Sequence, residues 1–163
     1  MIPSDLEEWI FPELDDGTDE AAVLHHECGI AFQFCVKLMD SQQFVITNQH
    51  LSAWRTTIEK IAAIAGHNCF SYNTLRADSD GVYHDEDGNT FAVLFAPSTF
   101  LEHNQVDGKP LFLVISEPEC ILTGSQSEAG TALLTQYSTK AAASHVVTID
   151  SKWDKWIVEV EFA

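Results

Sequence analysis

The chain has 163 residues, of which 45% are hydrophobic and ten are phenylalanine, enough apolar material for the core of one folded domain. Twenty-five acidic residues against eight basic ones give a net charge of −17, which excludes nucleic acids and anionic membranes as partners and favours a basic protein. The sequence begins without the segments of a secretion signal and has no apolar stretch of roughly 20 residues, so it predicts a cytoplasmic protein.

The first predicted element is a short helix at the N-terminus. Ser4 and Glu7 have the spacing of a capping box, and Pro12 ends the helix because proline cannot continue it. The residues that follow are acidic and polar, as in an exposed linker. We therefore expect residues 1–28 to form a short helix and an acidic linker, ahead of a single domain over residues 29–163.

A half-buried strand is predicted over residues 29–39, where hydrophobic and polar residues alternate. Phe32 and Phe34 lie on one side of this strand, and Gln33 and Lys37 lie on the other. A sheet with one face on the core and one face open to solvent produces this pattern.

The remaining elements follow from periodicity, caps and turn residues. Helices are recognised by apolar residues every three or four positions, and strands by short apolar or alternating runs. The predicted elements are a strand over 44–47, a helix over 48–65 that stops at Gly66, strands over 69–77 and 90–95, a helical turn over 98–103, a strand pair over 110–116 and 119–124, a helix over 125–142 opened by a second capping box at Ser125 and Glu128, and strands over 145–149 and 155–162.

The order hairpin, helix, hairpin occurs twice in this assignment, over residues 29–95 and again over residues 110–162. Such an order suggests a pseudo-repeat of two halves. It predicts an α+β fold, with a mostly antiparallel sheet and two main helices packed on one face.

Four segments in the middle and at the end of the chain resemble those of a family of bacterial proteins. The segments "FVITNQHLSAW", "IAAIAGHN", "TFAVLFAPSTFLE" and "KPLFLVISEPECILTGSQSE" occur in the order seen in the YtpQ-like family, over roughly residues 44–160. The chain departs from the family at Cys69, where a leucine is expected, and at "ISEPEC". No activity is established for that family, so the resemblance implies only a soluble bacterial protein of the α and β class.

The acidic stretch 77–95 was tested as a calcium loop. With Asp85 at position 1 of an EF-hand, Thr90 occupies the position of the invariant glycine and Ala96 that of the bidentate glutamate. The motif therefore fails, although a looser calcium site at residues 78–87 stays open. The sequence Asp87-Gly88 instead favours a hairpin turn that leads into a strand.

Two further clusters were weighed as enzyme sites. His25, His26, Glu27 and Cys28 could contribute to a zinc site, but neighbouring residues of a strand face opposite sides. Cys69 could be the nucleophile of a hydrolase, yet it follows a predicted helix C-terminus, whose dipole disfavours a thiolate. The four cysteines show no paired spacing, so we expect reduced thiols, with those at 35 and 120 buried. No nucleotide-binding motif is present, and no cofactor is predicted.

The net charge has two explanations: it keeps a small protein soluble, or it attracts a basic partner, and among specific functions the sequence favours binding through charge. The 36 N-terminal residues contain nine acids and no lysine or arginine, and residues 77–108 contain seven acids and again no base. We therefore expect a small acidic binding protein, such as an immunity-type inhibitor of a basic toxin nuclease, with the cysteine hydrolase or metal enzyme as the alternative. A homodimer that pairs through the strand 155–162 is a further alternative to a monomer. The candidate binding residues are Asp15, Asp16, Asp19, Asp78, Asp80, Asp85, Glu86, Asp87, Trp153 and Trp156.

Overall fold

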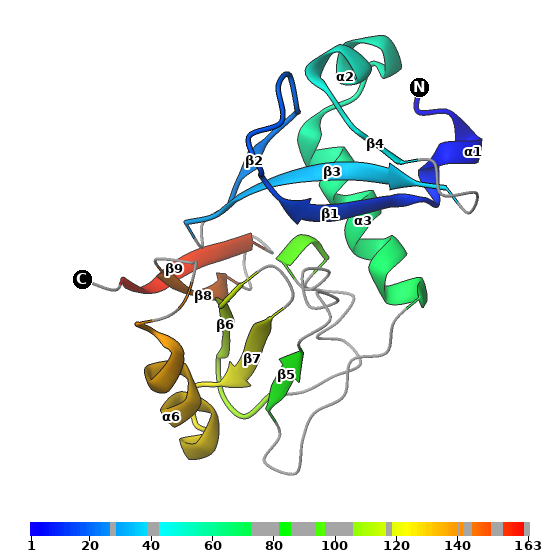
Figure 1. The fold of residues 1–163 in the computed structure, drawn as a ribbon. Helices are drawn as coiled ribbons and strands as arrows, with labels where there is room; N and C mark the ends of the chain where they lie inside the picture. The colour runs from blue at the N-terminus through cyan, green and yellow to red at the C-terminus, as the bar shows by residue number, and fades with distance from the viewer. Residues whose placement is uncertain are drawn as a thin grey trace.

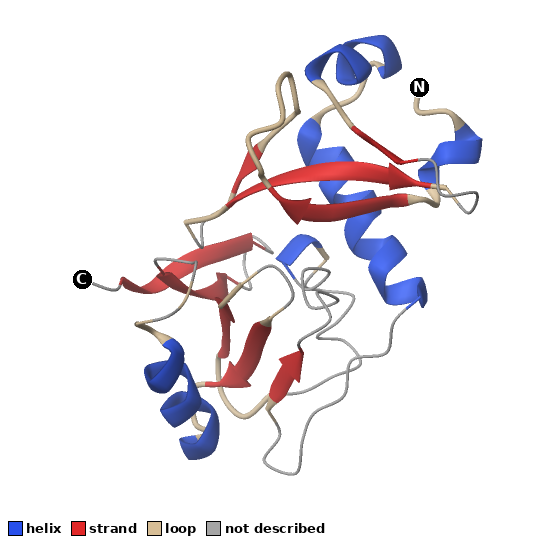
Figure 2. Ribbon diagram, in the orientation of Figure 1, coloured by secondary structure: helices blue, strands red, loops and turns tan. Residues whose placement is uncertain are grey.

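The protein consists of two antiparallel sheets and the helices packed on them (Figures 1 and 2). This is a computed structural model. The α+β class and the antiparallel pairing are as predicted. The structure describes residues 1–26, 29–38, 43–72, 82–85, 94–96, 106–116, 119–139, 141, 145–150 and 155–161.

The first sheet is built around β3 (Ala31–Lys37), the strand that alternation predicted. Strand β1 (Ile10–Leu14) pairs with one side of β3, while β2 (Leu24–His25) and β4 (Gln43–Val45) pair with the other. The prediction of a linker was therefore wrong over β1. Pro12, which was interpreted as a helix stop, lies opposite Phe34 in β1, and an edge strand tolerates proline because one side of its backbone needs no partner.

The N-terminal helix α1 (Ser4–Glu7) is shorter than predicted, and it lacks the predicted capping box. Pro3 occupies the N-cap position, and no side chain caps the helix. Helix α1 is instead tied to a helix far along the chain. Asn68 Nδ2 donates hydrogen bonds to the carbonyl oxygens of Glu7 (2.8 Å) and Ile10 (2.9 Å), which fixes the turn between α1 and β1.

Two helices replace the single one predicted over residues 48–65. Helix α2 (Asn48–Trp54) begins with a capping box made by Thr47 and His50, and it ends at Arg55, whose φ of 53° is left-handed. Helix α3 (Ile58–Tyr72) then continues past Gly66. The predicted stop at Gly66 and the strand that was to start at residue 69 were therefore wrong.

Gly66 lies within α3 at a point of close packing, and not at a helix end. A Cβ atom at this position would lie 3.1 Å from the Cβ atoms of Phe95 and Ala96, closer than such atoms normally approach. Leu94 and Phe95 form a helical turn against α3, so the strand predicted over 90–95 is wrong at these two residues. Its other residues, and the helical turn predicted over 98–103, lie outside the described part of the chain.

The second sheet has the strand order β5 (Tyr83–Asp85), β7 (Cys120–Gly124), β6 (Pro110–Val114), β8 (His145–Asp150) and β9 (Lys155–Glu161). The four strands from β6 onward are those predicted. Helix α6 (Glu128–Tyr137) connects β7 to β8 and packs on β7. Its N-cap is Ser127, whose hydroxyl accepts from the Gly130 N–H, and not Ser125 as the capping-box pattern suggested.

The sequence predicted one sheet with both main helices on one face, whereas the described residues form two sheets. Helix α3 packs on β1 and β3 of the first sheet, whereas α6 packs on the second. The order β6, β7, α6, β8, β9 matches the predicted hairpin, helix and hairpin of the second half. In the first half, β3 and β4 belong to the first sheet, whereas β5 pairs with β7 of the second sheet. The pseudo-repeat therefore stays a prediction.

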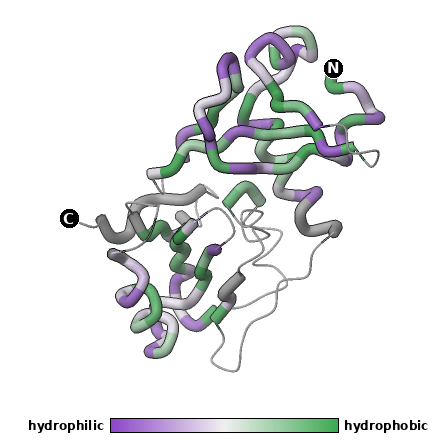
Figure 3. The backbone as a smooth tube through the Cα atoms, in the orientation of Figure 1, coloured by the Kyte–Doolittle hydropathy of each residue, from purple (hydrophilic) through white to green (hydrophobic). Residues whose placement is uncertain are grey.

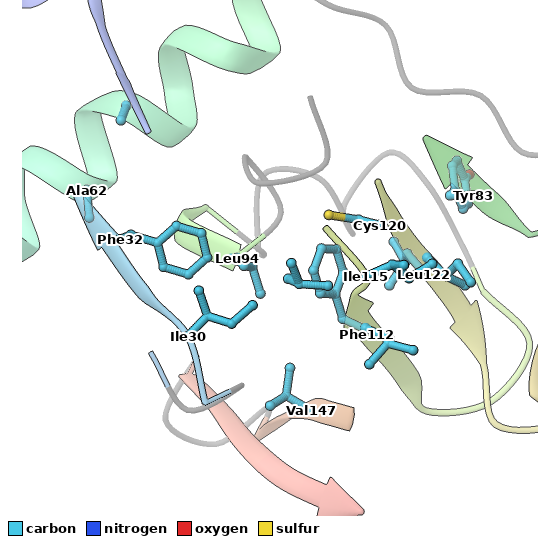
Figure 4. Close-up of a cluster of buried hydrophobic side chains, with 14 of the residues drawn as sticks. Ile30, Phe32, Ala62, Tyr83, Leu94, Phe112, Ile115, Cys120, Leu122 and Val147 are labelled. Carbon is cyan, nitrogen blue, oxygen red and sulfur yellow. The ribbon is translucent and has the colours of Figure 1, made fainter. Parts of the chain in front are cut away.

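One hydrophobic core joins both sheets. Figure 4 shows Phe32 of β3, Leu94, Phe112 of β6 and Val147 of β8 in the same cluster. Burial of each large apolar side chain contributes about 1.5–3 kcal/mol, so the sheets stabilise each other through this layer. The thiols of Cys35 and Cys120 are buried, as predicted, and neither takes part in a disulfide. None of the helices in the described ranges is long and apolar enough to cross a bilayer.

We expect Gly130→Ala to destabilise the protein, although alanine normally favours a helix over glycine by up to about 1 kcal/mol. The new Cβ would lie 1.7 Å from Thr123 Oγ1, so α6 would have to move away from β7. Overpacking of this kind costs about 1–3 kcal/mol, and it should outweigh the gain in helix propensity. Urea unfolding measures the difference, with exposed Ala129→Gly as the control for propensity alone. If Gly130→Ala were more stable than the wild-type protein, α6 and β7 would accommodate the added methyl group without cost, and the prediction would be wrong.

Candidate functional site

A loop rich in carboxylates connects β1 to β2, and we call residues 15–20 the acidic loop. All six of its residues are exposed, and four of them are acidic. Figure 3 shows the loop among the hydrophilic segments of the chain. In the part of the chain that the structure describes, no lysine or arginine pairs with Asp15, Asp16, Asp19 or Glu20. The loop therefore presents uncompensated negative charge.

Hydrogen bonds within the acidic loop hold its conformation. Asp15 Oδ1 accepts from the Gly17 N–H at 3.1 Å, and Asp16 Oδ1 accepts from the Thr18 N–H at 3.0 Å and from the Thr18 hydroxyl. Gly17 has a φ of 80°, which glycine adopts without strain. The hydrogen bonds from Thr18 lower the pKa of Asp16, because they favour the ionised form.

Gln33 at the centre of β3 is a fully buried polar residue, and it pairs across the sheet with Glu13, just before the acidic loop. Gln33 Nε2 donates to Glu13 Oε1 at 2.6 Å, and a side-chain hydrogen bond from Gln33 also contributes to the lowered pKa of Asp16. The buried amide thus links β3 to β1. The thiol of Cys35 lies 3.6 Å from Glu13 Oε2 on the same face of the sheet. This face was predicted to be open to solvent, but Gln33 and Cys35 are fully buried on it.

The far end of the acidic loop is held against α2. The Ala22 N–H donates to the Ile46 carbonyl at 2.9 Å, and the Asn48 N–H donates to the Glu20 carbonyl at 3.2 Å. Ala21 forms an isolated antiparallel bridge with Thr47. Glu20 has a φ of 65°, a left-handed conformation that is uncommon for a residue with a side chain. The loop is thus fixed at both ends.

A surface hollow lies where the acidic loop meets α2. It has a volume of about 390 Å³ and is lined by Glu20, Asn48, Gln49 and Ser52. All four side chains are exposed and polar, and within the described residues none of them makes a side-chain hydrogen bond. The hollow therefore offers one carboxylate, two amides and a hydroxyl that are free to bind a ligand.

The structure brings three of the ten predicted binding residues together. Asp15, Asp16 and Asp19 lie in the acidic loop of the first sheet, whereas Asp85 lies on β5, opposite Cys120 in the second sheet (Figure 1). Trp156 lies on β9, opposite Ile149. The other predicted residues lie outside the part of the chain that is described: Asp78, Asp80, Glu86, Asp87 and Trp153.

The two histidines that were weighed as metal ligands occupy different environments. His25 on β2 is exposed, whereas His26 packs edge-on against Phe32 and Phe95, with ring centroids 6.1 Å apart in both pairs. Burial lowers the pKa of His26 to about 4, and a hydrogen bond to the backbone of Leu94 opposes part of this effect. Glu27 and Cys28 lie outside the description. No group of three or more histidine, cysteine or acidic side chains placed to hold a metal occurs among the residues described.

Cys69 and β9 belong to the two remaining hypotheses, a cysteine nucleophile and a dimer that pairs through an edge strand. Cys69 lies in the last turn of α3, not after the helix, so the negative end of the helix dipole is close to it. Strand β9 stands at the end of the strand order of the second sheet, as the dimer hypothesis requires. The catalytic role of Cys69 and the dimer through β9 both stay predictions.

Comparison with known protein families, with curated proteins and with solved structures finds no match. The candidate site therefore rests on the residues of this chain. Sequence reasoning missed Gln33, Glu20 and the three residues of α2 that line the hollow. For Glu20 a signal existed, since it continues the acidic run; for the others, only the three-dimensional arrangement identifies them.

Proposed function

We propose that this protein is a small binding protein that captures a basic partner through the acidic loop, in the manner of an immunity protein that inhibits a cationic toxin such as a nuclease. A cytoplasmic location and a bacterial origin, which the sequence predicts, fit this role and belong to the proposal. The observation that carries it is a loop with four exposed carboxylates that is fixed at both ends and that pairs with no lysine or arginine of the described residues.

The fixed conformation of the loop matters for affinity. Binding normally orders flexible side chains and loops, and this ordering opposes association. Here the hydrogen bonds from Thr18 to Asp16 and from Asn48 to the Glu20 carbonyl hold the loop before any partner arrives. The carboxylates can then steer a basic protein over a distance of about 10 Å at moderate salt and meet it in a conformation that needs little rearrangement.

Affinity capture of proteins from the native cell extract tests the proposal. We expect the wild-type protein to retain basic proteins at low salt and to release them at high salt, because screening weakens attraction between exposed charges. A variant with Asp15→Asn, Asp16→Asn, Asp19→Asn and Glu20→Gln should retain much less. Retained proteins are then assayed for nuclease activity with and without the wild-type protein.

The matched control changes the same number of charges elsewhere. Exposed acids on other elements are available at Asp5, Glu7, Glu59 and Glu128, and the variant with all four neutralised should keep most of the binding. The proposal is wrong if the wild-type protein retains no basic protein at low salt. Equal losses in both variants would assign the attraction to net charge and not to the loop.

A further inference from the structure

We infer that the hollow between the acidic loop and α2 receives an arginine side chain of the basic partner. This inference rests on the proposed function and deepens it, because it names the residue type that the partner inserts. Glu20, Asn48, Gln49 and Ser52 line the hollow, and its volume of about 390 Å³ is within the range of small-molecule sites, about 300–1,000 Å³.

The chemistry of the lining selects a cation with several hydrogen-bond donors. Glu20 supplies two acceptor oxygens, and the amides of Asn48 and Gln49 and the hydroxyl of Ser52 supply further acceptors. The neighbouring carboxylates of the acidic loop make the potential around the hollow negative, which disfavours an anion. An apolar group would leave these polar side chains without partners and would gain little from burial.

An arginine satisfies this lining better than a lysine does. A guanidinium carries five N–H donors in a planar fork, so it can bind a carboxylate with two parallel hydrogen bonds and still donate to an amide or hydroxyl. A lysine ammonium has three donors on one atom, and water hydrates it more strongly. The structure therefore predicts a preference for arginine, and not only an attraction to positive charge.

The backbone around Glu20 supports a fixed receptor. The carbonyl of Glu20 accepts from the Asn48 N–H, so the loop and the first turn of α2 cannot separate without loss of this hydrogen bond. Ser52 is a neighbour of both Asn48 and Gln49 on the surface of α2, since residues four and three apart in a helix lie next to each other. Arg55 ends α2 three residues after Ser52, and it is not among the residues that line the hollow.

Blocked peptides of six arginines and of six lysines test the inference by calorimetric titration at low salt. We expect the arginine peptide to bind the wild-type protein about tenfold more tightly than the lysine peptide, as one or two additional hydrogen bonds to charged groups would give. Glu20→Gln should weaken the arginine peptide about tenfold and remove most of the preference. Glu128→Gln, on exposed α6, changes the net charge equally and should weaken both peptides alike, by less than about twofold.

Each outcome decides between the two proposals. If both peptides bind equally, and Glu20→Gln acts like Glu128→Gln, the arginine receptor is wrong while capture by the acidic surface survives. If neither peptide binds the wild-type protein, the proposed function fails, and the receptor fails with it. Should Glu20→Gln alter the fold, as thermal unfolding would reveal, Gln49→Ala is the second variant. It keeps every charge and should still reduce the preference for arginine about threefold.

Discussion

The substitution Gln33→Glu is expected to lower the free energy of unfolding by about 3 kcal/mol at neutral pH. Gln33 has no solvent exposure, and its amide nitrogen donates to Glu13 at 2.6 Å. The substitution keeps the shape of the side chain but replaces the donor with a carboxylate. The introduced carboxylate would then lie beside that of Glu13, and among the described residues no basic side chain pairs with either position.

The pH dependence of this loss identifies its cause. Burial and the neighbouring carboxylates should raise the pKa of the introduced carboxyl by about two units, so its penalty is present at neutral pH and is lost as the pH falls through the raised pKa. Once protonated, the carboxyl can donate to Glu13 as the amide does. The difference in stability between the variant and the wild-type protein should therefore shrink between about pH 7 and pH 5.

Urea unfolding at several pH values measures this effect. Gln43→Glu is the matched control, because Gln43 lies on β4 of the same sheet and is exposed. It makes the same chemical change and should alter the stability by less than about 0.5 kcal/mol. A loss for Gln33→Glu that does not depend on pH would mean that packing, and not charge, explains the role of Gln33. In that case the charge at position 33 does not affect the acidic loop, and the variant should bind basic proteins as the wild-type protein does.

The strand and helix content of the second sheet was largely predictable from the sequence, because local patterns determined it. The strands β6 to β9 are short apolar or alternating runs separated by turns, and α6 is amphipathic and capped by a serine. These are local signals, and tertiary contacts did not override them. The exact cap was missed by two residues, since Ser125 and Ser127 both precede the helix, and only the backbone decides which one caps it.

The errors in the first sheet share one physical cause: the same residue type serves different purposes in different surroundings. Pro12 ends a helix in water but is equally suited to an edge strand, and Gly66 resembles a helix stop but accommodates the close approach of Phe95 and Ala96. Arg55 breaks the predicted long helix without any glycine or proline, through a left-handed backbone that a sequence pattern does not reveal. Tertiary contacts decide each of these positions.

The candidate site was predictable as a chemical class but not as a geometry. The acidic run identified Asp15, Asp16 and Asp19, because charge is read directly from the sequence. Alternation in β3 assigned Gln33 to the side opposite Phe32, but it could not show that this side is buried as well or that Gln33 bonds to Glu13 there. The hollow combines one residue of the loop with three residues of α2, and no local pattern relates these two segments.

The second large effect is expected on acidification. His26 is neutral in the folded protein, where burial lowers its pKa to about 4, against an ordinary value of 6.5. The unfolded chain binds a proton at a higher pH than the folded chain does, so the stability that this difference provides is complete above about pH 6.5. It is lost progressively as the pH falls and is gone below about pH 4, a total of about 3 kcal/mol.

The substitution His26→Phe separates this contribution from the titration of the many carboxylates. Phenylalanine preserves the edge-on contacts with Phe32 and Phe95 but cannot bind a proton, so the variant should lose less stability than the wild-type protein between pH 7 and pH 4, by about 3 kcal/mol. Exposed His25→Gln is the control, and it should leave the wild-type pH dependence unchanged. Identical pH curves for the wild-type protein and His26→Phe would show that the imidazole reaches solvent and charges without disturbing the core, because a half-buried histidine that is held neutral requires the two curves to diverge on the acid side.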